Sequence, residues 1–191
     1  NTSADQFIRV IARPPRAGTR MHALLRMTLP CLAVLLLLAS VSQAQTNWYV
    51  DTAGPAFGNG SPGLPFPTIQ RALDHPQRLP GDIIRIRPGL YVEQLVLDGP
   101  GAILEPTAPG QGTVVLDGGR SGRVVDVIGP ARVRLEGLTL RGGFAGQGAG
   151  LRATDCLLEI VDCDFVDNEI DGTVLFPDGA GMWASGCDLI I

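Results

Sequence analysis

The chain has 191 residues, 25 of them glycine and 15 proline, and only 5% of its residues are aromatic. This composition is typical of a turn-rich all-β domain and disfavours a helical bundle. From Gln45 onward the chain keeps 18 of its 19 acidic residues and 10 of its 15 arginines, which gives a formal charge of −8. That charge argues against nucleic acid and anionic membrane as partners, because both require a basic face.

Residues 21–44 have the pattern of a secretory signal peptide, in which an apolar run follows Arg26 and small residues before Gln45 fit a cleavage site. The apolar run is too short to span a bilayer comfortably, so we expect no membrane span in the mature chain. Residues 1–20 are interpreted as upstream sequence outside the fold. We therefore expect a secreted, extracellular or outer-surface protein with a single folded domain over residues 45–191.

A short amphipathic helix is expected at roughly residues 68–75. Thr68 is a suitable N-cap, Ile69 and Leu73 share one face, and Pro76 ends the helix. A helix this short is not stable by itself, so it must dock on other elements. We interpret it as a cap over the open end of the first strands.

Short strands with one apolar and one solvated face follow this helix. Apolar and polar residues alternate with a period of two in the segments 84–87, 133–136, 138–141 and 158–160. This periodicity is typical of half-buried strands. We therefore expect the rest of the chain to consist of such strands, separated by turns rich in glycine, proline or asparagine.

The strands belong to an internal repeat. Gly148–Ile160 aligns without a gap with Gly179–Ile191, 31 residues later. Further upstream, residues 94–100, 113–119, 137–143 and 162–168 align with one another, and their last apolar residues form a column of Leu97, Leu116, Leu140 and Phe165. Strands that recur every 19–31 residues predict about four coils of a solenoid with stacked parallel sheets.

The segment Tyr49–Leu97 resembles the opening of right-handed parallel β-helix proteins of the pectin-lyase-like superfamily, through "YVD", "GSP…PF.TIQ.AL" and "GD.I.I.PG.Y.E". The later part is similar to the repeats of polymorphic outer membrane proteins, which pair a Gly-Gly-Ala-like element with Phe-x-x-Asn. Here these are Gly148–Gly150 and Phe165–Asn168. The resemblance implies an all-β, right-handed parallel β-helix with a short N-terminal capping helix. It implies no single chemistry, because this fold hosts lyases, hydrolases, epimerases, adhesins and passive surface proteins.

An acidic segment around Phe165 contains the metal-site candidate of this sequence. If Cys163 and Phe165 point inward, Asp162 and Asp164 point outward, ~7 Å apart along the strand. Two such carboxylates could share a calcium ion, and β-helix pectate lyases, which this chain resembles, hold calcium between aspartates on one sheet face. A solvated strand face and a pair of catalytic acids are the alternatives. The aligned positions one coil below add no further carboxylate, and we expect no other cofactor.

A lyase would also need an arginine or lysine base near the cation. Arg141 and Arg152 are the nearest candidates by topology, although Arg141 could instead pair with Asp164 or Asp167 on the surface. Asn168 is interpreted as a turn residue with left-handed backbone angles, because it aligns with a glycine in the coil below.

Three cysteines remain after Gln45, and two of them, Cys156 and Cys187, occupy the same position in consecutive repeats. Parallel strands lie ~4.8 Å apart, and disulfides join Cα atoms ~4.4–6.8 Å apart. A disulfide between the two coils is therefore allowed. The alternative is that Cys156, Cys163 and Cys187 are small buried residues stacked inside the coils.

These patterns favour a secreted or cell-surface β-helix module with a binding or structural, adhesin-like role. Its expected partners are polysaccharides or cell-surface glycans, and we expect a monomer. The alternative function is that of a polysaccharide lyase or epimerase acting on acidic glycans. Because residues 187–191 end inside an aligned strand, we expect residues 45–191 to be a C-terminally truncated part of a longer protein, with any such active site in later coils.

Overall fold

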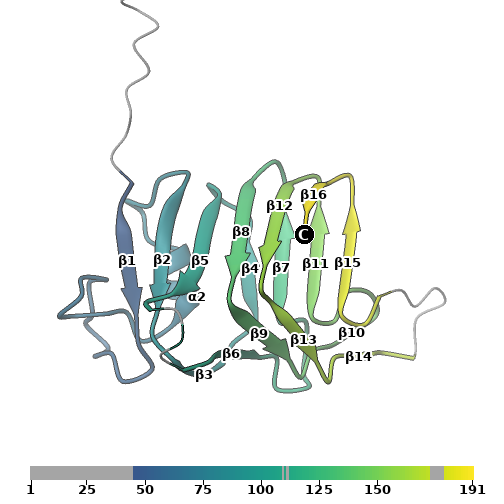
Figure 1. Ribbon diagram of the computed structural model, residues 1–191, viewed down its shortest axis with the longest axis horizontal. Helices are drawn as coiled ribbons and strands as arrows, with labels where there is room; N and C mark the ends of the chain where they lie inside the picture. Colours follow the sequence, from purple (N-terminus) through teal and green to yellow (C-terminus); the bar gives the residue numbers. More distant parts are fainter. Residues whose placement is uncertain (1–44, 109, 111, 173–178) are drawn as a thin grey trace, which may run out of the picture. The chain divides into compact units, whose positions relative to one another are not determined.

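The computed structural model describes residues 45–108, 110, 112–172 and 179–191 (Figure 1). The expected leader (1–20) and signal peptide (21–44) lie outside these residues. The described part of the chain is mostly strand and contains one short helix, which confirms the all-β class. None of its helical residues forms a segment long and apolar enough to cross a membrane.

The strands form three main parallel sheets and one small one. Sheet I contains, in spatial order, β1 (Asn47–Val50), β2 (Asp82–Ile86), β5 (Ala102–Pro106), β8 (Arg132–Glu136), β12 (Leu157–Val161) and β16 (Asp188–Ile190). Sheet II contains β3 (Gly89–Val92), β6 (Val114–Asp117), β9 (Leu138–Arg141) and β13 (Asp164–Val166). Sheet III contains β4 (Leu95–Leu97), β7 (Val125–Ile128), β11 (Leu151–Thr154) and β15 (Met182–Ser185). The fourth sheet pairs β10 (Phe144–Ala145) with β14 (Glu169–Ile170).

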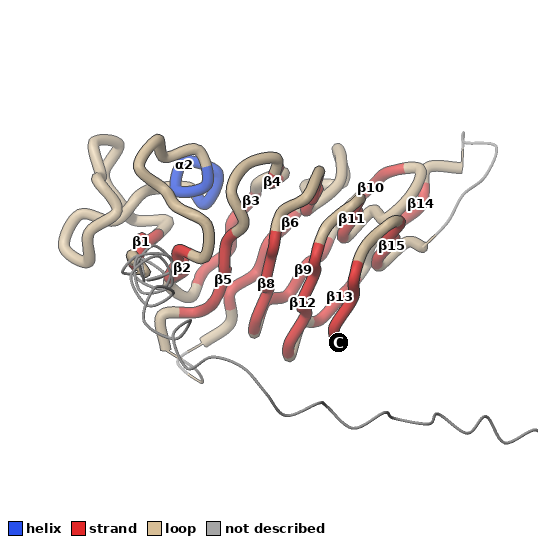
Figure 2. The backbone as a smooth tube through the Cα atoms, turned by 90° about the horizontal axis from the view of Figure 1, so that it is seen from above, coloured by secondary structure: helices blue, strands red, loops and turns tan. Residues whose placement is uncertain are grey.

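The chain visits sheets I, II and III in turn, and one passage through all three is called a circuit here. Each interior strand of sheets I, II and III therefore pairs with the strand one circuit earlier and the strand one circuit later, always in parallel. Figure 2 shows strands of successive circuits side by side along the molecule. The 31-residue repeat is confirmed, because β11 pairs with β15 and β12 with β16 in the predicted register.

Inward side chains stack in columns that run from circuit to circuit. One such column in sheet I consists of Ile84, Leu104, Leu135 and Ile160. The first three are fully buried and the last is 6% exposed. Burying an aliphatic side chain of this size contributes about 1.5–3 kcal/mol to stability. The apolar residues of the predicted alternation therefore form the hydrophobic core.

The predicted column in sheet II is correct except for its first member. The residues in register are Tyr91, Leu116, Leu140 and Phe165. Leu97 lies instead in sheet III, paired with Val127. The members of the true column are separated by 25, 24 and 25 residues. Leu97 lies only 19 residues before Leu116, too few for a circuit through sheet II, and the local likeness of "QLVLDG" to "TVVLDG" caused the error.

The turn after β13 differs from the prediction in which residue takes the left-handed conformation. The residue with left-handed backbone angles is Asp167, with φ of 51°, and not Asn168. The Asn168 side chain instead bridges to the previous circuit. Its Oδ1 accepts a hydrogen bond from the Gly143 amide and its Nδ2 donates one to the Leu140 carbonyl, both at 2.9 Å. A side-chain amide thus satisfies two main-chain groups at this corner.

A helix lies within the predicted range, as α2 (Ile69–Leu73), with Thr68 as its N-cap. It packs against β1, β2 and β4. The Glu93 carboxylate accepts hydrogen bonds from the first two helical amides, each at 3.0 Å. The Gln70 side chain accepts a hydrogen bond from the Val96 amide in β4 and donates one to the Val96 carbonyl. Gln70 thus occupies the place that a neighbouring strand would take beside β4.

Candidate functional site

Charged residues on the outer face of sheet I pair across neighbouring strands. Arg85 on β2 forms an ion pair with Glu105, its register partner on β5. Arg134 on β8 pairs with its register partner Glu159 and also with Glu136, the latter at 2.7 Å. Opposite charges directly across a strand pair are mildly stabilising. These carboxylates therefore support the stacking of circuits.

Sheet II has a corresponding pair, Asp117 and Arg141, whose Nε and Oδ2 atoms are 2.9 Å apart. The backbone amide of Gly119 and the Arg141 guanidinium hold the pKa of Asp117 below its ordinary value. The expected pairing of Arg141 with Asp164 or Asp167 is therefore wrong, since Arg141 contacts the preceding circuit rather than the following one. Arg141 pairs with Asp117 because the two residues lie directly opposite each other in neighbouring strands.

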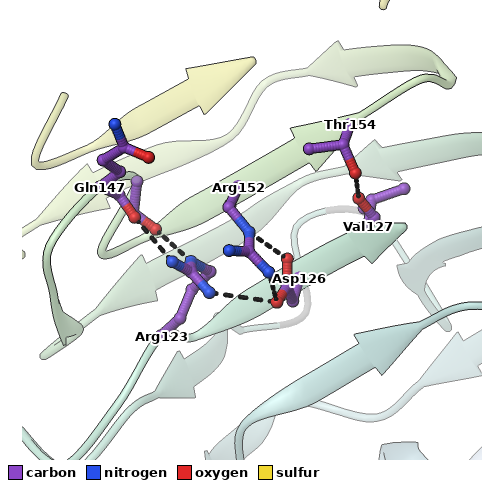
Figure 3. A network of polar contacts seen from close by, with 7 residues as sticks. Arg123, Asp126, Val127, Gln147, Arg152 and Thr154 are labelled. Atoms are coloured by element: carbon purple, nitrogen blue, oxygen red, sulfur yellow. Dashed lines mark hydrogen bonds and ion pairs between the residues drawn. The ribbon is translucent and has the colours of Figure 1, made fainter. Parts of the chain in front are cut away.

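Two arginines share one carboxylate of sheet III, Arg152 from β11 and Arg123 from the turn before β7 (Figure 3). Arg152 donates to both oxygens of Asp126, at 2.9 and 2.6 Å, and Arg123 donates to Oδ2 at 3.1 Å. Arg123 also donates to the carbonyls of Gln147 and Gly148, at 2.9 and 3.0 Å. Burial lowers the pKa of Arg123 from its ordinary value. This network fastens the turn before β11 to β7, and it engages Arg152, the second arginine considered as a base.

The two predicted calcium ligands are exposed, as expected from an inward Cys163 and Phe165. Asp162 makes the corner before β13 with φ of 49°, and Asp164 is the first residue of β13, opposite Thr139. Within the described ranges no group of three or more acidic, histidine or cysteine side chains is arranged to hold a metal ion. A calcium site at Asp162 and Asp164 remains a prediction.

A groove of about 770 Å³ lies over the beginnings of β2, β5 and β8. Three prolines line it, Pro80, Pro100 and Pro130, each two residues before the first residue of its sheet I strand. The outward side chain of Ile103 adds to this apolar lining. We call this feature the proline groove. It offers a largely apolar surface that spans three successive circuits.

The polar side of the proline groove is formed by Arg132, Arg134 and Glu159. Arg134 is fully engaged with carboxylates, whereas Arg132 reaches Glu159 only at 4.0 Å and its side chain is 73% exposed. Beneath the groove, the buried Arg78 side chain donates to the carbonyls of Pro100 and Gly101 and fixes that turn. The groove therefore combines a rigid apolar lining with one accessible guanidinium.

The proline groove was not predicted from the sequence, although a signal for it is present. Proline recurs two residues before β2, β5 and β8, and this position is visible once the strands are aligned. Gly101, directly before β5, also lies close to the start of β8. A Cβ at this position would lie 2.0 Å from the Arg132 carbonyl oxygen. Local alternation identifies the strands but not which turns meet in space.

The three cysteines of the described part are free. Cys163 is half-buried at the corner before β13, and burial raises the pKa of its thiol. Cys156 and Cys187 lie immediately before β12 and β16, and their Sγ atoms are 3.1 Å apart. The prediction that these two are neighbours in consecutive circuits is confirmed.

Comparison with known proteins gives few matches. No protein-family model matches the chain, and no curated protein does. Among solved structures, a rhamnogalacturonan lyase is similar with a TM-score of 0.35 and 16% sequence identity, over 74% of this chain. The likeness covers 51% of that enzyme, so this chain spans about half of its length.

Proposed function

We propose that residues 45–191 form a right-handed parallel β-helix of the pectin-lyase-like kind, with α2 as its N-terminal cap. The passage of the chain through three parallel sheets in turn supports this architecture. The hydrogen bonds of Gln70 to β4 support the capping role, because they satisfy main-chain groups at a sheet edge. The signal-like residues 21–44 support a secreted or cell-surface location.

The function that the geometry favours is binding of a glycan chain, in an adhesin-like role, along the proline groove. The observation that carries this proposal is the groove itself, which is open, about 770 Å³ in volume and continuous over three circuits. An extended saccharide presents apolar ring faces and polar edges, and sites for such ligands combine apolar lining with a few placed polar groups. Arg132 supplies a charge-assisted donor for a carboxylate on the sugar.

The contacts favour binding over the alternative of a lyase or epimerase. Proton abstraction beside a uronate carboxylate needs a base that is free to act. Arg141 is held by Asp117, and Arg152 by Asp126. Both arginines considered as bases therefore serve the pairing between circuits, and the proline groove contains neither of them.

The test is calorimetric titration of the full chain with a neutral and a uronate-containing oligosaccharide of equal length. We expect the uronate ligand to bind more tightly, and Arg132→Ala to weaken that binding about tenfold, because a charge-assisted contact is lost. Arg120→Ala is the matched control, since Arg120 is also exposed but pairs with Glu169 and does not line the groove. Equal binding by wild type and Arg132→Ala would contradict the proposal, as would release of unsaturated product by the wild type.

A further inference from the structure

Cys156 and Cys187 are closer than packing alone requires. Their Sγ atoms are 3.1 Å apart, and the Cys156 amide also lies 3.4 Å from the Cys187 Sγ. Both residues stand at the same corner of successive circuits, directly before β12 and β16. The two side chains therefore point at each other from adjacent turns of the chain.

The main chain on both sides holds this pair in place. The Asp155 amide donates to the Ser185 carbonyl and the Asp188 amide donates to the Cys156 carbonyl, both at 2.9 Å. These bonds continue the parallel ladder through the corner, where neighbouring chains lie ~4.8 Å apart. That separation falls within the ~4.4–6.8 Å between Cα atoms that a disulfide requires. Closing the bond needs only a small movement of the two sulfur atoms.

The two cysteines differ in how they are exposed at this corner. A cavity of about 310 Å³ opens at this corner, and Asp155, Cys156, Gly186 and Asp188 line it. Cys187 is half-buried, whereas Cys156 is 6% exposed. Burial, and then the contact with Cys187, raise the pKa of the Cys156 thiol to about 12. Cys187 is therefore the sulfur that meets an oxidant first.

We propose that Cys156 and Cys187 are a redox-active dithiol pair that closes into a disulfide between two successive circuits. The oxidant is a small disulfide of the glutathione type. The Cys187 thiolate attacks one sulfur of the oxidant, forming a mixed disulfide and releasing one thiol. Cys156 then gives up its proton and attacks the Cys187 sulfur, and the second thiol leaves. Two protein thiols are oxidised and one small disulfide is reduced to two thiols.

Such a disulfide would link β16 covalently to β12. This strand is an edge of sheet I in the described part of the chain, where it pairs with β12. Its side chains Leu189 and Ile190 are 40% and 52% exposed. A disulfide at its first corner would fix the register of β12 and β16 and restrict the unfolded chain. Oxidation would thus stabilise the pairing of β16 with β12.

The test oxidises the folded full chain with oxidised glutathione, blocks the remaining thiols, and maps the peptides by mass spectrometry without reduction. We expect a linked peptide joining Cys156 to Cys187, with Cys163 still alkylated as in the untreated protein. Cys163→Ser is expected to keep the link. Cys156→Ser and Cys187→Ser should lose it, and Cys187→Ser should react with glutathione far more slowly at Cys156.

A second measurement is independent of peptide recovery. Oxidation should raise the thermal midpoint of wild type and Cys163→Ser, and leave that of folded Cys156→Ser unchanged. Mixed glutathione disulfides without the Cys156–Cys187 link would overturn the proposal, as would a link formed equally well after the chain is unfolded before oxidation. Links to Cys163 in the folded protein would overturn it as well.

Discussion

The first and last described members of one inward column in sheet I differ in both polarity and exposure. The column runs through Asp82, Ala102, Val133, Leu158 and Leu189, one residue from each of five successive strands. At the β1 end its member is a carboxylate that is 1% exposed, and at the β16 end it is a leucine that is 40% exposed. The polar member of this column is therefore the buried one, and its last apolar member is partly exposed.

The difference is explained by what covers each end. Asp82 accepts hydrogen bonds from the amides of Thr46 and Leu79 and from the indole of Trp48, at 2.9–3.0 Å. These donors lie outside the repeated strands that form the rest of the column. Leu189 continues the column of buried Leu158 but has a neighbouring strand on one side alone in the described part of the chain. The buried carboxylate of this column is therefore satisfied by specific residues outside it, whereas the later strands add apolar members.

The largest effect should come from the aromatic packing at the β1 end. Phe66 is 2% exposed and its ring stacks beside Trp48, with centroids 6.1 Å apart. Phe66→Ala should lower the free energy of unfolding by about 4 kcal/mol, because it leaves a cavity. Leu189→Ala is the comparison at the other end and should cost about 1 kcal/mol, since that side chain is only partly removed from water. Urea denaturation of both variants measures the difference.

Equal losses of stability in the two variants would contradict this expectation, because they would mean that the two regions contribute alike. A change in the dependence of unfolding on urea for Phe66→Ala alone would indicate that the β1 end unfolds separately from the remaining circuits.

Much of the fold was predictable because it depends on local periodicity. The alternation around Ile84 predicted a strand there, and the column through Leu140 and the gapless repeat at Cys156 and Cys187 predicted the correct register of later strands. The placement of Leu97 failed because alternation says which face a residue takes but not which sheet its strand joins. Counting residues per circuit would have corrected it.

The candidate site was less predictable because it is made by turns. Extending the alternation back from Ile84 places Asp82 inward, but its donors come from residues 46, 48 and 79, whose positions depend on the whole first circuit. The proline groove likewise depends on three turns that are 20 and 30 residues apart in the chain. Such contacts follow from the stacking of circuits, which no local pattern describes.

A smaller effect is expected from the buried carboxylate. Burial raises the pKa of Asp82, but the hydrogen bonds from Leu79, Trp48 and Thr46 outweigh it, so the pKa lies below its ordinary value. Its stabilising contribution is therefore present above about pH 4 and is lost as the pH falls through the folded-state pKa. Asp82→Asn should cost about 2 kcal/mol at neutral pH. It should also remove part of the acid-induced loss of stability seen in the wild type.

Urea titrations at neutral pH and at a series of acidic pH values measure both quantities. The exposed Asp164, which forms no ion pair within the described ranges, provides the control Asp164→Asn, and we expect that variant to follow the wild-type pH profile. An Asp82→Asn profile parallel to that of the wild type would show that Asp82 is not the group that titrates.

The smallest effect should be local to β4, where Gln70 pairs with Val96 in place of a strand. Gln70→Ala removes both hydrogen bonds and should cost about 1 kcal/mol, which speeds hydrogen exchange of the Val96 amide about fivefold if exchange follows local opening. Gln94→Ala is the matched control, because Gln94 donates to the Ser121 hydroxyl and not to a strand edge. If Val96 exchanges at the same rate in both variants, the Gln70 hydrogen bonds do not protect the Val96 amide. If only Gln70→Ala speeds exchange at Val96, a single side-chain amide makes the hydrogen bonds to β4 that a neighbouring strand makes elsewhere. Main-chain groups of β4 are then satisfied by a side chain, whereas those between successive circuits are satisfied by other main-chain groups.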